Sequence, residues 1–156
     1  MSDRAFQDVI PGNQCWGCGP HNKHGLHVKS YWQGQESVCR WEPASYFMAG
    51  PPHILNGGII ATIIDCHCVC TAIAAAYRSE DRCMESLPPI WYATGSLKVT
   101  YLRPTPISGA AELRARIESA SARKTVLSCT LLAAGEERVQ AEVVAIRVPE
   151  GWRDPD

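Results

Sequence analysis

A long apolar helix without a polar face is the feature that most restricts how this chain can fold. From Gly57 to Tyr77 almost every residue is apolar or small. A helix that is hydrophobic on every side lies in a protein core or in a membrane. A carboxylate, Asp65, stands near the middle of the run, and placing it in a bilayer would cost about 2.5–3.5 kcal/mol. The sequence therefore predicts a buried core helix and no membrane span.

Strand-like runs lie on both sides of this helix. Before it, 26–32 and 37–42 alternate between apolar and polar residues and predict a hairpin of two strands. After it, four more runs alternate with period two, and the turns between them are short enough to join antiparallel neighbours in a meander. These four runs are 91–103, 110–119, 125–134 and 138–148.

One helix buried on nearly every side fits six antiparallel strands only if the sheet curls around it. A flat sheet would cover a single face of the helix. The 156 residues are enough for one domain with one core. We therefore expect a single α+β domain over residues 1–156, with an N-terminal loop segment over 1–25 and a frayed tail over 149–156.

The charge balance points to a small-molecule partner. The chain carries 15 basic and 16 acidic residues, which gives no electrostatic footprint for nucleic acid or for an acidic membrane surface. Residues 1–14 contain no apolar run and do not resemble a secretory signal. The predicted location is therefore the cytoplasm, where the eight cysteines are expected to be reduced thiols.

The start of the apolar helix combines features of a reaction centre. Asn56 is the predicted N-cap, and Gly57 with Gly58 allows another group to approach the free N–H groups of the first turn. Such a terminus can polarise a carbonyl. At about 1.5 Å per residue, Asp65 lies roughly 12 Å along the axis from Gly57, so both cannot touch one reacting atom. If the two groups cooperate, they come from two antiparallel helices, most simply in a two-fold dimer.

Three motifs carry a resemblance to a known family. They are the pattern Cys-x-x-Cys-Gly-x-x-Asn-x-x-Gly-Leu over 15–26, the helix start Asn56-Gly57-Gly58 followed by Asp65, and the strand over 94–104. With these motifs the chain resembles a hot-dog-fold thioesterase of the subgroup similar to phenylacetyl-CoA and other acyl-CoA thioesterases. The resemblance covers nearly the whole chain. It implies a curved antiparallel sheet wrapped around one long helix, and hydrolysis of an acyl-CoA by a homodimer or homotetramer. It implies no cofactor, because coenzyme A is part of the substrate.

The same resemblance implies a role for each catalytic candidate. The Gly57 amide would polarise the thioester carbonyl, and Asp65 of the partner subunit would be nucleophile or general base. The hydroxyl of Thr94 would help to hold the attacking water. The family's helix start is His-Gly-Gly, with the acid nine positions after the histidine; here Asn56 stands nine positions before Asp65. This departure leaves the catalytic rate or the substrate identity open.

Further residues are expected to contact the substrate. Basic residues near strand ends and turns could meet the phosphates of coenzyme A, and Arg78 or Arg82 after the helix could do likewise. His53, in the loop before the helix, either replaces the missing histidine or is a solvated loop residue. The predicted substrate-binding residues are His53, Gly58, Ser96, Lys98, Arg103, Arg123 and Lys124.

The strongest competing interpretation of the N-terminal segment is a metal site. Two cysteines and three histidines recur there at every third position, and zinc accepts such ligands. Their spacing is tighter than the usual separated ligand pairs, so we predict no metal and interpret the segment as a loop packed beneath the sheet. His67, in the helix, is expected to be a core or interface histidine. The five candidate ligands are Cys15, Cys18, His21, His24 and His27.

Two other functions remain open. The first keeps the fold but makes the domain a non-catalytic acyl-CoA or acyl-carrier binding module, which the asparagine at position 56 would favour. The second is a hydratase or dehydratase of the same fold, whose usual helix-start motif of Asp and His is missing here. Dinucleotide fingerprints, phosphate loops and the Gly-x-Ser-x-Gly elbow are also absent from the sequence.

Overall fold

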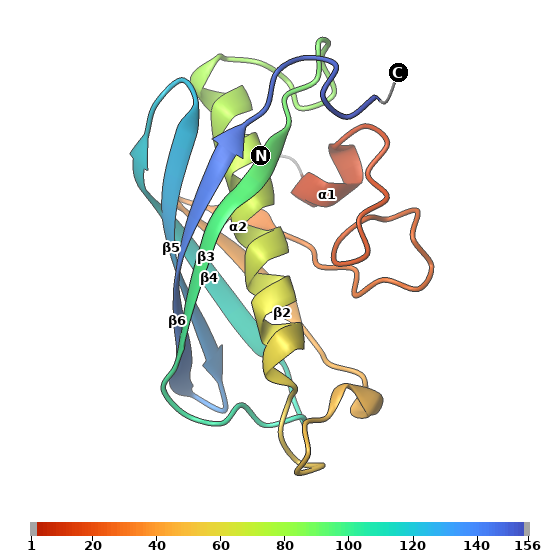
Figure 1. The fold of residues 1–156 in the computed structure, drawn as a ribbon, viewed down its shortest axis with the longest axis vertical. Helices are drawn as coiled ribbons and strands as arrows, with labels where there is room; N and C mark the ends of the chain where they lie inside the picture. The colour runs from red at the N-terminus through yellow and green to blue at the C-terminus, as the bar shows by residue number, and fades with distance from the viewer. Residues whose placement is uncertain (1–2, 155–156) are drawn as a thin grey trace.

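The computed structural model describes residues 3–154 as one six-stranded antiparallel sheet packed against one long helix (Figure 1). The predicted number of strands and the single long helix are confirmed. The elements are α1 (Phe6–Val9), β1 (Tyr31–Gln33), β2 (Glu36–Trp41), the 3-10 helix η1 (Ser45–Phe47), α2 (Gly57–Ser79), β3 (Tyr92–Tyr101), β4 (Ala111–Ala120), β5 (Lys124–Ala133) and β6 (Glu136–Arg147).

The strand order differs from the predicted meander at one junction. The order is β1-β2-β4-β5-β6-β3, so β3 pairs with β6 and not with β4. The segment 102–110 does not turn back as a hairpin. It runs past the start of α2, where Leu55 N–H donates to Thr105 O at 2.8 Å and Ile107 N–H donates to His53 O at 2.9 Å. These bonds carry the chain to the other half of the sheet and leave β3 as an edge strand.

Two layers bury α2, one on each side. Strands lie on one side and the N-terminal segment lies on the other (Figure 1). That segment packs closely: a Cβ built on Gly17 would lie 2.3 Å from the Sγ of Cys66. By length and composition α2 could cross a membrane, but 67% of its most apolar window is buried inside the protein. The N-terminal segment also has apolar anchors in Phe6 and Ile10, which the sequence pattern did not reveal.

The first strand is shorter than predicted. Of the alternating run 26–32, only Tyr31 and Trp32 belong to β1, which pairs with β2. Further back, the N–H groups of Leu26 and Val28 donate to Trp16 O and Gly17 O, at 2.9 and 3.2 Å, and so join the N-terminal loop instead of the sheet. The alternation there reflects burial against that loop.

The predicted frayed tail is docked over its described part. Residues 149–154 form turns, and Arg153 Nη1 donates to Pro11 O at 2.9 Å. The Arg153 guanidinium also lies over the Trp91 ring, 5.4 Å from its centroid. Residues 155–156 of the predicted tail, and residues 1–2 at the other end, lie outside the described residues.

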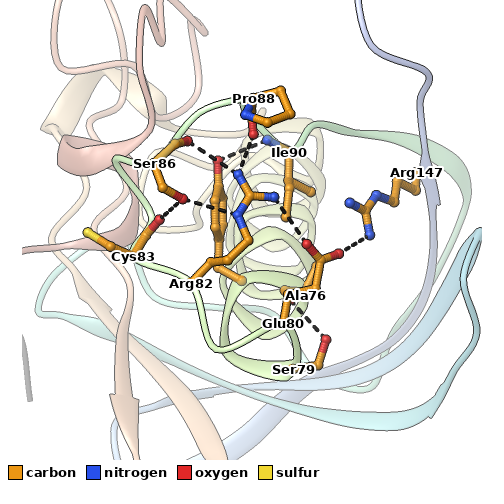
Figure 2. Close-up of polar contacts among 10 residues, drawn as sticks. Ala76, Ser79, Glu80, Arg82, Cys83, Ser86, Pro88, Ile90 and Arg147 are labelled. Carbon is orange, nitrogen blue, oxygen red and sulfur yellow. Dashed lines mark hydrogen bonds and ion pairs between the residues drawn. The ribbon is translucent and has the colours of Figure 1, made fainter.

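Arg82 holds the loop after α2 in place (Figure 2). Its guanidinium donates to the carboxylate of Glu80 at 3.0 Å, to the hydroxyl of Ser86 at 3.2 Å and to the backbone oxygen of Pro88. Glu80 also pairs with Arg147 on β6, which connects this loop to the sheet. Arg82 was a candidate for binding coenzyme A phosphates, but its donors are engaged within the fold.

His67 is the centre of a buried polar network whose hydrogens can be assigned. Thr71 Oγ1 donates to the backbone oxygen of His67 at 2.7 Å, so the Ser37 hydroxyl donates to Thr71 at 2.6 Å. Ser37 then accepts from His67 Nε2 at 3.2 Å. Nδ1 is left to accept from the Ser30 hydroxyl at 2.7 Å, and Ser30 in turn accepts from Gln7 at 2.8 Å. Each group is satisfied when His67 is neutral with its proton on Nε2.

This network predicts a loss of stability in acid. Burial lowers the pKa of His67 from 6.5 to about 4, so between these values the unfolded chain binds the proton and the folded chain does not. The contribution to the free energy of unfolding is constant above pH 6.5, falls as the pH drops toward 4, and is constant again below that. We expect the free energy of unfolding of His67→Gln, measured by urea denaturation at a series of pH values, to lack this fall between pH 6.5 and 4. Equal slopes for the variant and the wild type between pH 6.5 and 4 would contradict the assignment.

Candidate active site

One face of α2 is less covered than the rest and carries Asp65. The residues Gly58, Thr62, Asp65 and Val69 are exposed or half-buried, and their spacing of four, three and four places them on one side of the helix. The edge strand β3 reaches this face, where the Thr94 hydroxyl donates to Asp65 Oδ1 at 2.7 Å. The contact between these two predicted residues is therefore present within one subunit.

The surroundings of Asp65 make it a stronger base than an ordinary carboxylate. Burial raises the pKa of Asp65, and the hydrogen bond from Thr94 opposes that rise by stabilising the charged form. Among residues 3–154, Thr94 is the one hydrogen-bond partner of the carboxylate, so the second oxygen is free to act on a water or a substrate atom. A base whose pKa lies nearer to neutral accepts protons more effectively in general base catalysis.

The helix start leaves one backbone donor unused. Asn56 is the N-cap, as predicted, and its Oδ1 accepts from the amides of Gly58 at 2.8 Å and Ile59 at 3.2 Å. The Gly57 N–H makes no hydrogen bond within the described part of the chain. Tyr101 on β3 donates to the Gly57 carbonyl at 2.6 Å and so fixes the orientation of this turn.

The two predicted reacting groups lie on one rigid helix. Gly57 and Asp65 stand eight positions apart on α2, or roughly 12 Å along the axis. Their contacts on β3, Tyr101 and Thr94, are also far apart on that strand. The chain therefore carries two separate candidate half-sites, which we call the amide half (Gly57 with Tyr101) and the acid half (Asp65 with Thr94).

Both half-sites border the free edge of β3. This strand is ten residues long and pairs on one side only, with β6. Its register shifts between Thr94 and Ser96, where Gly95 packs against β6: a Cβ there would lie 2.7 Å from Ile146 Cγ1. An unpaired edge of this length presents a row of backbone donors and acceptors to another chain.

The basic substrate-binding candidates fall into two groups. Lys98 lies on β3, and Arg103 follows its end near the amide half, where it pairs with Glu136 at 3.2 Å. Arg123 lies in the turn between β4 and β5 and Lys124 begins β5, at the opposite end of the sheet, because the register aligns that turn with the start of β3. Within one subunit these two groups do not meet.

The other substrate-binding candidates are exposed. His53 lies in the loop before α2, on the side of the amide half, and has no contact with Asp65 of its own chain. Ser96 is exposed just after the irregularity in β3, and the Gly58 amide is bound to Asn56. Arg78 lies over the Trp32 ring, 4.0 Å from its centroid. The roles of these residues remain predictions.

The clefts beside Arg78 are not at the half-sites. Two clefts of about 440 and 620 Å³ border Trp32 and Arg78, and neither includes Asp65 or Gly57 in its lining. The unused amide of Gly57 and the carboxylate of raised pKa therefore lie outside both clefts.

The structure separates the candidate metal ligands of the N-terminal segment and places another cysteine beside two of them. The histidines of the N-terminal segment do not join the cysteines; the ring of His27, for example, bonds to Asn22 O at 2.6 Å. Instead, Cys66 of α2 lies beside Cys15 and Cys18. The spacing of the cysteines in α2 was the available signal, because positions 66 and 70 lie on one helical face.

Comparison with solved structures identifies the family. A crystal structure of a thioesterase superfamily protein from Shewanella loihica PV-4 matches with a TM-score of 0.66 and 31% identity, over 82% of this chain and 96% of that chain. The chain belongs to the thioesterase superfamily. The predicted hot-dog fold is confirmed. The PaaI protein of E. coli, from the phenylacetic acid degradation operon, matches with a TM-score of 0.64 over 80% of this chain and 82% of its own, and at 9% identity supports the fold alone.

Two curated acyl-coenzyme A thioesterases are similar to this chain over part of their length. The acyl-coenzyme A thioesterase THEM4 of Xenopus laevis is 28% identical over 109 residues, which are 70% of this chain and 43% of the relative. THEM4 of Mus musculus is 30% identical over 99 residues, or 64% and 37%. The chain thus spans less than half the length of these relatives. No family model matches the chain.

The contact between Thr94 and Asp65 predicts a titration difference. Thr94→Val removes a donor that stabilises the carboxylate, so we expect the pKa of Asp65 to rise further above its ordinary value of 3.8. Thr94→Ser keeps the hydroxyl and should leave the pKa where it is in the wild type. Carboxyl ¹³C chemical shifts followed over a pH series measure both. Identical titrations of the valine and serine variants would show that the hydrogen bond does not set this pKa.

Proposed function

We propose that this protein is an acyl-CoA thioesterase that works as a dimer, with the acid half of one subunit facing the amide half of the other. The observation that carries the proposal is the unused Gly57 N–H at the start of α2, two helical turns away from a carboxylate of raised pKa. The Gly57 N–H has no hydrogen-bond partner among the described residues, and the Asp65 carboxylate has one, Thr94. Membership of the thioesterase superfamily and the similarity to THEM4 supply the reaction class.

Pairing of β3 with its copy would bring the halves together. If two β3 edges pair antiparallel about a two-fold axis, the α2 helices behind them also run antiparallel. The start of one helix then lies near the middle of the other, which is the offset that the separation of Gly57 and Asp65 requires. The half-buried face of α2 and the free edge of β3 both support such an interface.

The chemistry follows from the two halves. The thioester carbonyl oxygen accepts from Gly57 N–H, where the positive end of α2 stabilises the negative charge that develops on attack. Asp65 of the partner subunit takes a proton from water, which attacks the carbonyl carbon, and Thr94 orients that carboxylate. Collapse of the tetrahedral intermediate breaks the carbon–sulfur bond, and the leaving coenzyme A thiolate takes the proton from Asp65, which gives the free thiol, a carboxylic acid and the regenerated carboxylate of Asp65.

Asn56 replaces the family histidine without occupying the oxyanion position. Its Oδ1 accepts from the amides of Gly58 and Ile59, but its Nδ2 donates to none of residues 3–154. This Nδ2 is available as a second donor toward the substrate. The proposed contacts of the coenzyme A phosphates are Lys98 and Arg103 of the same subunit, together with Arg123 and Lys124 of the partner subunit, because the two groups lie at opposite ends of one sheet. The reaction needs no cofactor, and we propose the cytoplasm as its location.

The alternative is a non-catalytic acyl-CoA binding module. The asparagine at position 56 favours it, because a titrating ring of the related motif is missing. The two functions differ in one readout, since a binding module holds the thioester intact whereas a thioesterase releases free thiol.

Thiol release from a panel of aliphatic and aromatic acyl-CoAs tests the proposal. We expect turnover of at least one substrate class by the wild type, and a loss of about 10²–10⁴-fold in kcat for Asp65→Asn, which keeps the shape and removes the base. Binding of the same acyl-CoAs by calorimetry should persist in the variant. Tight binding by the wild type without any thiol release would replace the thioesterase with the binding module.

One substitution removes the proposed donor of the amide half and little else. Proline is well tolerated at the first position of a helix, and Asn56, with φ −59° and ψ 130°, already has the conformation that precedes a proline. Gly57→Pro therefore removes the N–H while the fold is kept, and we expect kcat to fall about 10²–10³-fold. Gly57→Ala is the control, because a Cβ there meets Tyr101 at an ordinary 3.5 Å and the N–H remains. Equal activities of the two variants would remove the amide from the mechanism.

A further inference from the structure

Four cysteines from two distant segments converge beneath the N-terminal loop. Cys15 and Cys18 come from that loop, and Cys66 and Cys70 lie one turn apart on α2. The Sγ atoms of Cys15 and Cys66 are 3.7 Å apart, and those of Cys18 and Cys70 are 3.8 Å apart. The Sγ atoms of Cys15, Cys18 and Cys66 all lie within 4.8 Å of one another; the Sγ of Cys70 is that close to Cys18 but not to all three.

We propose that these four thiolates bind one Zn²⁺ ion in a structural site. Sulfurs about 2.3 Å from a tetrahedral zinc ion lie about 3.8 Å from one another, which is close to the two Sγ separations given above. The ligands form two pairs, Cys-x-x-Cys in a loop and Cys-x-x-x-Cys on one helical face. Zinc sites commonly combine two such separated pairs. Binding would displace the four thiol protons to solvent.

Asn13 supports the two loop ligands. It is buried, its Oδ1 accepts from the Cys15 amide at 3.1 Å, and its Nδ2 lies 3.6 Å from the Sγ of Cys18. An N–H aimed at a sulfur is the kind of outer contact that orients and stabilises a thiolate ligand. The side chain of Asn13 thus connects both cysteines of the loop pair.

The surroundings favour a closed site over a reactive one. Cys18, Cys66 and Cys70 are buried and only Cys15 is exposed. A Cβ on Gly17 would lie 2.3 Å from Cys66 Sγ, so the loop backbone itself covers the cluster. Four protein ligands leave no open position for substrate, which distinguishes a structural zinc from a catalytic one. The ion would attach the N-terminal segment to the middle of α2, next to Asp65.

Metal content of the purified full chain tests this proposal. After expression in zinc-supplemented medium and extensive dialysis, we expect one zinc per chain by plasma mass spectrometry. Cys18→Ala and Cys66→Ala should lose it. Cys68→Ala is the matched control, because Cys68 is also buried in α2 but outside the cluster, and it should retain one zinc.

A second measurement covers the case in which a cysteine variant fails to fold. Wild-type protein loaded with Co²⁺ in place of zinc should show the sulfur-to-metal charge-transfer and visible bands of a tetrahedral tetrathiolate. Asn13→Ala, which keeps all four ligands, should weaken zinc affinity about 10–100-fold. Neither readout measures thiol release. The zinc proposal is therefore tested independently of the thioesterase function.

Several results would overturn the zinc site. Folded, reduced wild type that takes up neither zinc nor cobalt would do so, as would zinc that Cys18→Ala and Cys66→Ala retain at full stoichiometry. Visible absorption of an iron–sulfur cluster in the protein as isolated would assign the thiols to another metal. Disulfides among the four cysteines in protein alkylated under native conditions would also contradict the proposal.

Discussion

The structure depends on burying a helix that has no polar face. A sheet can cover only one side of α2, so a second layer is required, and the N-terminal segment provides it by packing Gly17 against Cys66. What remains uncovered is a narrow face with Asp65 near its middle and the glycines at its start. The same requirement explains why the short α1 and the loop after it, which look polar in the sequence, are anchored through Phe6 and Ile10.

The remaining open face lies beside an open strand edge. The bonds of 102–110 past the start of α2 carry the chain away from β3, which leaves β3 unpaired on one side. The acid half and the amide half both lie along this edge, and one rigid helix holds them apart. In a single chain the backbone edge of β3 is unpaired and the two halves are far apart, and the proposed two-fold interface would pair the edges and bring the halves together.

The sequence predicted the parts of the fold that depend on local pattern. The all-apolar helix, its N-cap Asn56 and the alternating strands all follow from residues close together in the chain. The pairing of β3 with β6 could not be read in this way, because a proline-containing segment that turns back and one that crosses have the same local composition. Leu26 and Val28 alternate like a strand but bond to the loop at Trp16 and Gly17.

The candidate site, too, was predictable from the sequence only where it depends on residues close together in the chain. The spacing of Gly57 and Asp65 is a property of one helix and was available from the sequence, whereas the contact of Tyr101 with the Gly57 carbonyl depends on tertiary packing. The cysteines show the limit most clearly. Cys15 and Cys18 were visible as a pair, but their partners Cys66 and Cys70 lie far along the chain, and only the docking of the loop on α2 brings the four together.

Complementation between two inactive variants tests the shared site most directly. In a dimer of one Asp65→Asn chain and one Gly57→Pro chain, a site built from two subunits leaves one centre intact and places both substitutions in the other. Equal mixing with random reassociation makes half of the dimers mixed, so the account predicts recovery of about a quarter of wild-type thiol release. If each site lay within one subunit, every centre would carry a substitution, and a mixture no more active than its parents would contradict the account.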